Sequence, residues 1–210
     1  MEFWSRFDAI AREHDVLRHR FYVRWSAGEL SVTELADYSG QYRHAVVALA
    51  QASASAAASA DGALGRKLAA HAAEEAEHIE LWDRFVDAVG GERAATPNRE
   101  TVACASAWSG AGGRGLLGTL VALYAIESAQ PQISKTKRDG LATHYGIDGP
   151  PAAYFELHER LDVAHASAGR KLIDARLADA DHERLLGEAE VVLRSNWKLL
   201  DGVERALSHA

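Results

Sequence analysis

The chain has 210 residues, of which 48% are hydrophobic and 25% charged, as in ordinary globular proteins. Its formal net charge of −7 at pH 7 offers no basic surface for nucleic acid or an acidic membrane. The single cysteine excludes an internal disulfide and a cysteine-ligated metal cluster, and it agrees with a cytoplasmic location. No run of about 18 apolar residues predicts a membrane span, and the first residues lack the pattern of a secretory signal.

Long stretches without proline, rich in Ala, Leu, Glu and Arg, predict an all-α protein. We find no internal repeat, and no linker of Pro, Gly or Ser divides residues 1–210, so one domain is expected. Apolar residues at helical spacing predict an N-terminal helix over residues 2–26. This helix is expected to break near Asp15 and to end at Gly28.

Two long helices are predicted next. Ser31 and Glu34 form a capping box, because the serine hydroxyl can accept from the Glu34 amide while the Glu34 carboxylate accepts from the Ser31 amide. A helix therefore begins at Ser31 and runs to about Ser59. Another helix is predicted over residues 61–89, where Gly90-Gly91 gives a stop signal.

The second half of the chain predicts four more helical segments. A short one surrounds Cys104, and the glycine-rich loop 109–115, which lacks the end of a phosphate loop, connects it to a nearly all-apolar helix. Pro131 is expected to kink that helix, which ends near Tyr145. Amphipathic helices follow over residues 150–177 and 179–209. Core candidates in the last one are Leu185, Leu186, Val191, Val192, Trp197, Leu199 and Leu200.

A set of possible metal ligands lies on the helix predicted over residues 150–177. His158, Asp162 and His165 stand at i, i+4 and i+7, so all three share one helix face. Two imidazoles and a carboxylate on one face are typical of a metal site. The alternative is three unrelated residues on a solvated face, because short spacing patterns recur by chance.

Two further helices carry carboxylates and a histidine. Glu74 and Glu75 precede His78 by four and three residues, so either can share its face, and Glu-x-x-His is a ligand pair of di-iron helical bundles. The alternative is an acidic, solvated face. Glu127 follows an apolar run, and a buried carboxylate needs a partner, either a metal ion or one of the following lysines and arginines.

Together these helices offer nitrogen and oxygen donors for more than one ion. Three histidines with three carboxylates suit two neighbouring iron or manganese ions, since carboxylates can bridge and imidazoles can end the coordination. Open positions would remain for dioxygen. A single structural zinc ion is disfavoured, because thiolates are lacking and the ligands are too many.

The order of these motifs resembles the haem-oxygenase-like dimetal oxidases, whose fold is shared with TenA- and PqqC-like proteins. Within that group the chain is similar to the branch of the chlamydial protein associating with death domains and its bacterial relatives. The resemblance covers nearly the whole chain. It rests on five stretches, namely Leu17–Leu30, Tyr38 with Gln41-Tyr42, Glu74–Trp82, Tyr124–Ser128 with Lys137–Leu141, and Tyr154–His165.

The resemblance implies a bundle of seven to eight helices, with two iron ions or iron and manganese, dioxygen and an external reductant. It carries the ligand roles to Glu74 or Glu75, His78, Glu127, His158, Asp162 and His165. It also implies synthesis of p-aminobenzoate for folate from an internal tyrosine, which matches Tyr22. Lys137 matches the family's amino donor, and Tyr154 matches its tyrosine near the metals. From spacing alone, both tyrosines would be core residues and Lys137 a surface residue.

Two positions depart from the family pattern. The family's third-helix glutamate stands seven residues before its histidine, where this chain has His71. A related branch that acts on fatty acids uses Glu-x-x-His, which favours Glu75 as the ligand. Ile126 stands where the family has a tyrosine before the middle glutamate, which puts a radical relay there in doubt, although Tyr124 is near.

Other functions remain open at this point. One is a dimetal oxidase of a free small molecule, such as an amino acid or a fatty acid. Another is a metal-free relative, a thiaminase or a PqqC-like cofactorless oxidase, but the expected middle-helix cysteine is missing. A purely regulatory role would not need six converging ligands. We expect small-molecule partners, no nucleic acid or membrane, and a homodimer, because this fold often dimerises.

Overall fold

The computed structural model describes residues 2–110 and 113–207, and every regular element within them is helical. This confirms the predicted all-α class for the described part of the chain. The α-helices are α1 (Glu2–Glu13), α2 (Arg20–Ala27), α3 (Val32–Ala58), α4 (Gly62–Ala88), α5 (Arg99–Ser109), α6 (Gly115–Glu127), α7 (Gln130–Gly140), α8 (Ala153–Asp174) and α9 (His182–Leu207).

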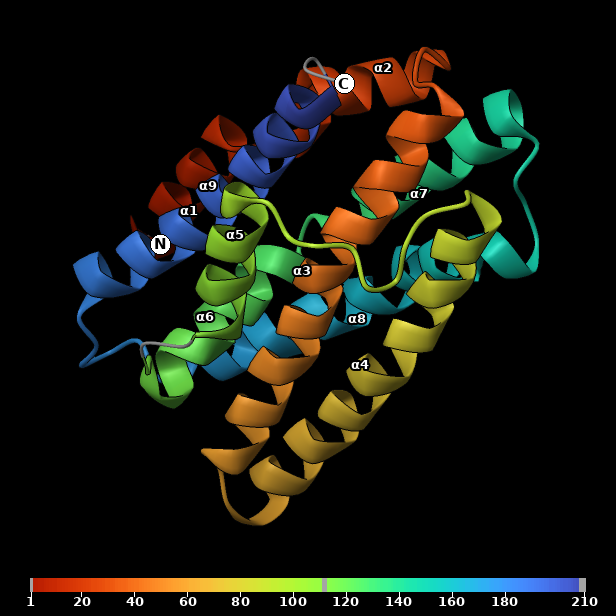
Figure 1. The fold of residues 1–210 in the computed structure, drawn as a ribbon. Coiled ribbons are helices and arrows are strands. Elements are labelled where there is room, and N and C mark those ends of the chain that lie inside the picture. The colour runs from red at the N-terminus through yellow and green to blue at the C-terminus, as the bar shows by residue number, and fades with distance from the viewer. Residues whose placement is uncertain (1, 111–112, 208–210) are drawn as a thin grey trace.

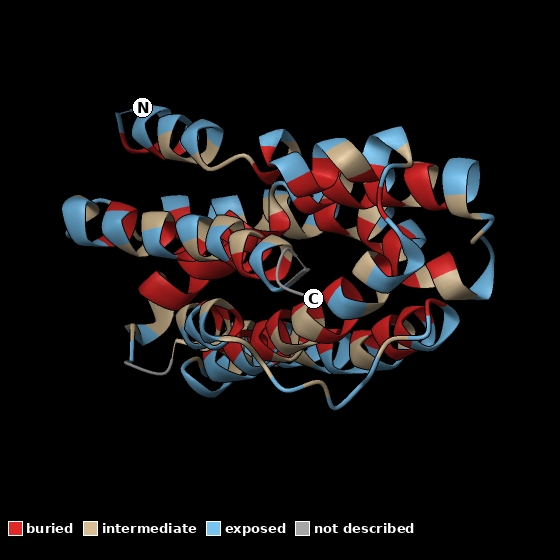
Figure 2. Ribbon diagram, turned by 45° about the horizontal axis from the view of Figure 1, so that its top comes forward, coloured by how far each residue is buried: buried red, intermediate tan, exposed pale blue. Residues whose placement is uncertain are grey.

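Helices α4, α6 and α8 surround the candidate site. Helices α3 and α4 form a long antiparallel pair, and α8 packs against α4, α6 and α7 (Figure 1). Helix α6 is central, because it contacts α3, α8 and α9, and every residue from Gly118 to Glu127 is buried. The buried residues lie mostly on the inner faces of the helices, as Figure 2 shows. Residues at the inner faces of α4, α6 and α8 can therefore meet away from water.

The predicted start signals operate as expected. Asp15 caps a short 3₁₀ turn over Val16–Arg18, which separates α1 from α2, and Gly28 ends α2 with a φ of 71°. The capping box of α3 is complete, since Ser31 and Glu34 each accept from the other's backbone amide. Glycine is needed at residue 28, because other residues rarely adopt this left-handed conformation.

Three details differ from the sequence-based expectation. Pro131 does not kink a continuous helix but lies in the first turn of α7, where its missing amide costs no hydrogen bond. Val191 is 43% exposed rather than part of the core. The last helix begins at His182, and residues 208–209 of its predicted range lie outside the described residues, as do residues 111–112 of the glycine-rich loop. No described helix is long and apolar enough to cross a membrane.

Candidate metal centre

Six of the seven residues predicted as metal ligands come together between α4, α6 and α8. Five of them are almost completely buried, with exposed fractions of 2% for Glu75, 5% for His78, 4% for Glu127, and 1% for His158 and Asp162. The side chain of His165 is 19% exposed and closes one side. An ionisable group buried to this degree is costly unless it has a partner, and a bound metal ion is one partner that these side chains can share.

Glu74 lies outside this group. Its side chain is 51% exposed, and its contact is with His165, whose Nε2 lies 3.4 Å from Glu74 Oε2. Successive helix residues point about 100° apart, so only one of two adjacent glutamates can face the interior. The structure places Glu75 there and Glu74 at the surface.

One residue of the cluster was not predicted. His71 stands one turn before Glu75, and its Nε2 lies 3.5 Å from Glu75 Oε1 and 3.3 Å from Glu127 Oε1. Its spacing of seven residues from His78 puts both on one helix face, which was a usable signal. The family pattern has a glutamate at that position, so the resemblance did not identify His71 as a ligand. We call His71, Glu75, His78, Glu127, His158, Asp162 and His165 the ligand cluster.

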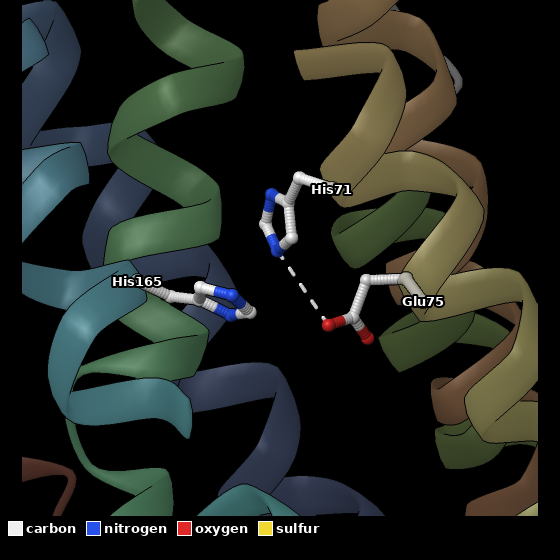
Figure 3. Close-up of side chains that lie close together, drawn as sticks. All are labelled: His71, Glu75 and His165. Atoms are coloured by element: carbon white, nitrogen blue, oxygen red, sulfur yellow. Dashed lines mark ion pairs between the residues drawn. The ribbon is translucent and has the colours of Figure 1, made fainter. Parts of the chain in front are cut away.

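The cluster contains two groups that each can hold an ion, and they share Glu75. One group is Glu75, His78 and His158, in which His78 Nδ1 lies 3.4 Å from Glu75 Oε1. The other is His71, Glu75 and His165, drawn in Figure 3, where the side chains from α4 and α8 point into the same space. A carboxylate common to two ligand groups is suited to bridge two ions.

Asp162 connects the two histidines of α8. The imidazole of His158 donates from Nδ1 to Asp162 Oδ2 at 2.9 Å, and His165 Nδ1 lies 3.5 Å from Oδ1. A carboxylate on Nδ1 fixes the tautomer of His158 and leaves its Nε2 lone pair free for a metal.

Each member of the ligand cluster has one buried polar atom without a hydrogen bond, counted within residues 2–110 and 113–207. Several of these atoms lie instead in ion pairs of 3.3 to 3.5 Å. The atoms are His71 Nε2, Glu75 Oε1, His78 Nδ1, Glu127 Oε1, His158 Nε2, Asp162 Oδ1 and His165 Nδ1. Buried polar atoms are nearly always paired, so this set fits bound metal ions, and its nitrogen and oxygen donors suit iron or manganese.

Burial and neighbouring charges have opposing effects on the pKa values of the cluster residues. Burial favours a neutral carboxyl at Glu127 and holds its pKa above the usual range, while contacts with His71 oppose this only partly. For Glu75, burial acts in the same direction, but contacts with His71 and His78 outweigh it and lower the pKa below its usual range. Burial alone would lower the pKa of His71, yet the contacts with Glu127 and Glu75 raise it to about 10.

A mostly apolar pocket lies next to the ligand cluster. Its volume is about 220 Å³, and three members of the cluster line it, namely His71, Glu127 and His165. The rest of its wall includes Leu120, Leu123, Tyr124 and Leu172. A small apolar molecule fits in a pocket of this size beside the cluster.

The predicted amino donor, Lys137, is buried and surrounded by aromatic rings. It is 1% exposed, and its Nζ lies 4.4 Å from the centre of the Tyr42 ring and 5.2 Å from that of Tyr22. We call the five surrounding rings, Tyr22, Tyr38, Tyr42, Trp82 and Phe155, the aromatic cage. Lys137 is therefore not the surface lysine that spacing alone suggested. Its burial lowers its pKa well below 10.5.

Tyr154 stands between the aromatic cage and the ligand cluster. The centre of its ring lies 4.2 Å from that of His158 and 4.9 Å from that of Trp82. Within the cage, the hydroxyls of Tyr22 and Tyr38 are hydrogen-bonded at 2.9 Å. The three residues predicted to be catalytic, Tyr22, Lys137 and Tyr154, therefore belong to one continuous group of buried side chains.

Replacing Lys137 with methionine is expected to change how stability depends on pH. Between the lowered pKa of folded Lys137 and about 10.4, the unfolded chain binds a proton that the folded chain does not. This residue therefore makes the wild-type free energy of unfolding rise by ~1.4 kcal/mol per pH unit. Lys137→Met should be the more stable protein near neutral pH, and its advantage should shrink as the pH rises.

Urea unfolding of both proteins at several pH values up to about 10 measures this difference, and other titrating groups cancel in the comparison. Lys135→Met is the matched control, because the side chain of Lys135 is 48% exposed. An advantage of Lys137→Met that stays constant with pH would show that the buried amine keeps its proton.

Comparison with known proteins places the chain among redox enzymes. The family described as "Iron-containing redox enzyme" matches residues 36–197, which include the whole ligand cluster. The 4-aminobenzoate synthase of Chlamydia trachomatis is 31% identical over 96% of this chain and 91% of its own length. A protein of the same name from Nitrosomonas europaea is 28% identical over 96% of this chain and 90% of its own.

Solved structures share the fold at low sequence identity. A TenA homologue from Pseudomonas syringae superimposes with a TM-score of 0.83 at 15% identity, over 97% of this chain and 91% of that one. A TenA homologue from P. horikoshii gives a TM-score of 0.73 at 18% identity, over 95% of this chain and 93% of that one. The TenA-like fold expected from the sequence is thereby confirmed.

Proposed function

The chain belongs to the iron-containing redox enzyme family, and on this basis we propose that it is an oxygenase with two metal ions that makes 4-aminobenzoate. The aromatic ring of the product would come from Tyr22 and its nitrogen from Lys137. The observation that carries this proposal is the burial of both residues in one aromatic cage beside the ligand cluster. An exogenous substrate would not require a buried amine at that place.

The ligand cluster would hold two iron ions, or one iron and one manganese, through Glu75, His78, Glu127, His158, Asp162 and His165. Bound there, the metals would supply the activation of dioxygen with electrons from an external reductant. The protein's own residues prepare the rest of the site. Tyr154 lies between Trp82 of the cage and His158 of the ligand cluster, and all three side chains are buried.

The charge states of Tyr22 and Lys137 suit the proposed roles. Burial raises the pKa of Tyr22 well above 10, so the phenol keeps its proton and its hydrogen bond to Tyr38. Burial lowers the pKa of Lys137 well below 10.5 and thereby favours the neutral amine. A neutral amine has a lone pair available to form a bond with an oxidised ring, which an ammonium ion lacks.

Protein labelled with ¹⁵N only at lysine tests the proposal. The purified chain would be loaded with Fe(II), or with Fe(II) and Mn(II), without oxygen and then given a reductant and air. We expect 4-aminobenzoate that carries ¹⁵N, in an amount of no more than one molecule per chain, together with a changed intact mass of the protein. Unlabelled product formed over many turnovers, with an unchanged chain, would contradict a self-processing enzyme.

A dimetal oxidase of a free small molecule is the second candidate function. The apolar pocket of about 220 Å³ beside His71, Glu127 and His165 favours it, because the pocket can hold a small substrate against the ligands. Repeated turnover of an added amino acid or fatty acid, unaffected by Tyr22→Phe, would support this reading over the first.

A further inference from the structure

We propose that His71 is itself a metal ligand, so that four imidazoles rather than three hold the two ions. This inference rests on the two-metal centre of the proposed function and goes beyond its six ligands. It assigns a binding role to a residue where the family pattern has a glutamate.

The first support is a pattern that occurs on both α4 and α8. Helix α4 carries His71-x-x-x-Glu75-x-x-His78, and helix α8 carries His158-x-x-x-Asp162-x-x-His165. Each helix therefore offers histidine, acid and histidine on one face, over two turns. The imidazoles of α4 meet those of α8 between the two helices.

The second support is the pairing of these imidazoles across the two helices. The rings of His78 and His158 are 4.7 Å apart, and those of His71 and His165 are 4.4 Å apart. Each pair joins one residue of α4 to one of α8, and each forms a possible ion-holding group with Glu75. Without His71, the group on the side of His165 would lose one of its two imidazoles.

The third support is the position of His71 Nε2. It is buried, has no hydrogen bond within the described residues, and lies 3.3 Å from Glu127 Oε1 and 3.5 Å from Glu75 Oε1. Ligand atoms that each stand about 2.1 Å from one ion are separated by roughly 3 Å. Figure 3 shows the imidazole directed at the space between Glu75 and His165. An ion in this space would be within reach of His71, Glu75 and His165 after small side-chain movements.

A different role for His71 would be a cationic partner for Glu75 and Glu127. Two metal ions would supply the positive charge that these carboxylates need, and a protonated imidazole next to them would be repelled. With the ions bound, His71 would be neutral, and its Nε2 lone pair would be directed at the ion that the carboxylates also bind. The same residue can therefore balance charge in the metal-free protein and bind the ion when it enters.

Cobalt(II) binding to the full chain tests the proposal without measuring activity. Equilibrium dialysis counts the ions per chain, and NMR of the cobalt-loaded protein counts the imidazole N–H signals shifted by the metal. For wild type we expect two ions. For His71→Gln we expect one ion bound as before, the second bound about 10- to 100-fold more weakly or lost, and one shifted signal fewer. His165→Gln should behave alike, because it removes the partner ligand of the same ion.

His44→Gln is the control, since His44 lies outside the cluster and its Nε2 contacts the Ala95 carbonyl. If His71→Gln does not fold, His71→Gly with added imidazole replaces it, and we expect imidazole to restore the second ion. Two ions with wild-type affinity and an unchanged number of shifted signals in the His71 variant would overturn the inference while leaving the proposed function intact. A wild-type chain that binds fewer than two ions would overturn both.

Discussion

Glu75→Gln is expected to lose metal binding and about 100-fold or more of its 4-aminobenzoate formation, whereas Glu74→Gln keeps both. Glu75 is 2% exposed, and its Oε1 lies 3.4 Å from His78 and 3.5 Å from His71. It is common to both possible ion-holding groups, so its loss affects both ions at once. Changes to groups that only support metal ligands already cost about 10- to 100-fold.

Glu74 is a closely matched control, because it has the same chemistry and is adjacent in sequence. Its side chain is half exposed, and its Oε2 lies 3.4 Å from Nε2 of His165. Exposed charged contacts of this kind contribute little, about 0–1 kcal/mol. Metal content after anaerobic loading and product yield would be measured for both variants. Equal losses in the two, or a larger loss in Glu74→Gln, would contradict the ligand assignment.

The Glu75→Gln variant also distinguishes the effect of the negative charge from that of the side chain's size. It keeps the length of the side chain and the helix propensity but removes the negative charge that a bridging ligand needs. The folded protein should persist, because the variant no longer buries a carboxylate. A normal circular dichroism spectrum with lost metal binding is therefore the expected combination.

The sequence predicts much of the fold because local signals decide it. Asp15, Gly28 and the Ser31–Glu34 box each act within a few residues, and the structure has all three where predicted. The role of Pro131 could not be predicted from local sequence, since proline is compatible with both a kink and the first turn of a helix. Which of the two occurs depends on the packing of α6 and α7, which no local pattern contains.

The candidate site, too, is only partly predictable from local sequence. Spacing brings His158, Asp162 and His165 to one face, but it cannot choose between Glu74 and Glu75, because helix rotation depends on neighbouring helices. His71 was overlooked for another reason, since a family pattern with glutamate there made it a departure rather than a candidate.

The burial of Lys137 could not be predicted from its surroundings in sequence. It lies in Gln130–Gly140, a helix of mostly polar residues, and its neighbours Lys135 and Arg138 are partly exposed, in ion pairs with Asp139. Only the tertiary packing of aromatic rings from α2, α3, α4 and α8 around Nζ reveals the cage. Polar composition indicates a solvated helix and says little about a single inward residue.

Tyr22→Phe and Lys137→Arg are each expected to abolish 4-aminobenzoate formation and rescue of a p-aminobenzoate auxotroph, while metal content stays at the wild-type level. Tyr22 lies in the aromatic cage and not in the ligand cluster. Phenylalanine therefore removes the phenol hydroxyl, which the proposed oxidation requires, and its 2.9 Å hydrogen bond to Tyr38 while leaving the ligands in place. Arginine at residue 137 cannot become neutral, because its pKa exceeds 12, and so has no free lone pair to donate.

The controls use residues of the same type outside the cage. Lys135→Arg changes an exposed lysine two residues away, and Tyr145→Phe changes a tyrosine whose hydroxyl accepts from the Leu30 amide; both should keep full rescue. Lys137→Arg also places a permanent charge in the cage, so its folding is checked separately by thermal unfolding, and Lys137→Met, which carries no charge, should give the same loss of product. Rescue that persists in both Tyr22→Phe and Lys137→Met would assign the ring and the nitrogen to a free substrate. In that case the apolar pocket beside His71 and Glu127, rather than the aromatic cage, would be the place where the reacting molecule binds.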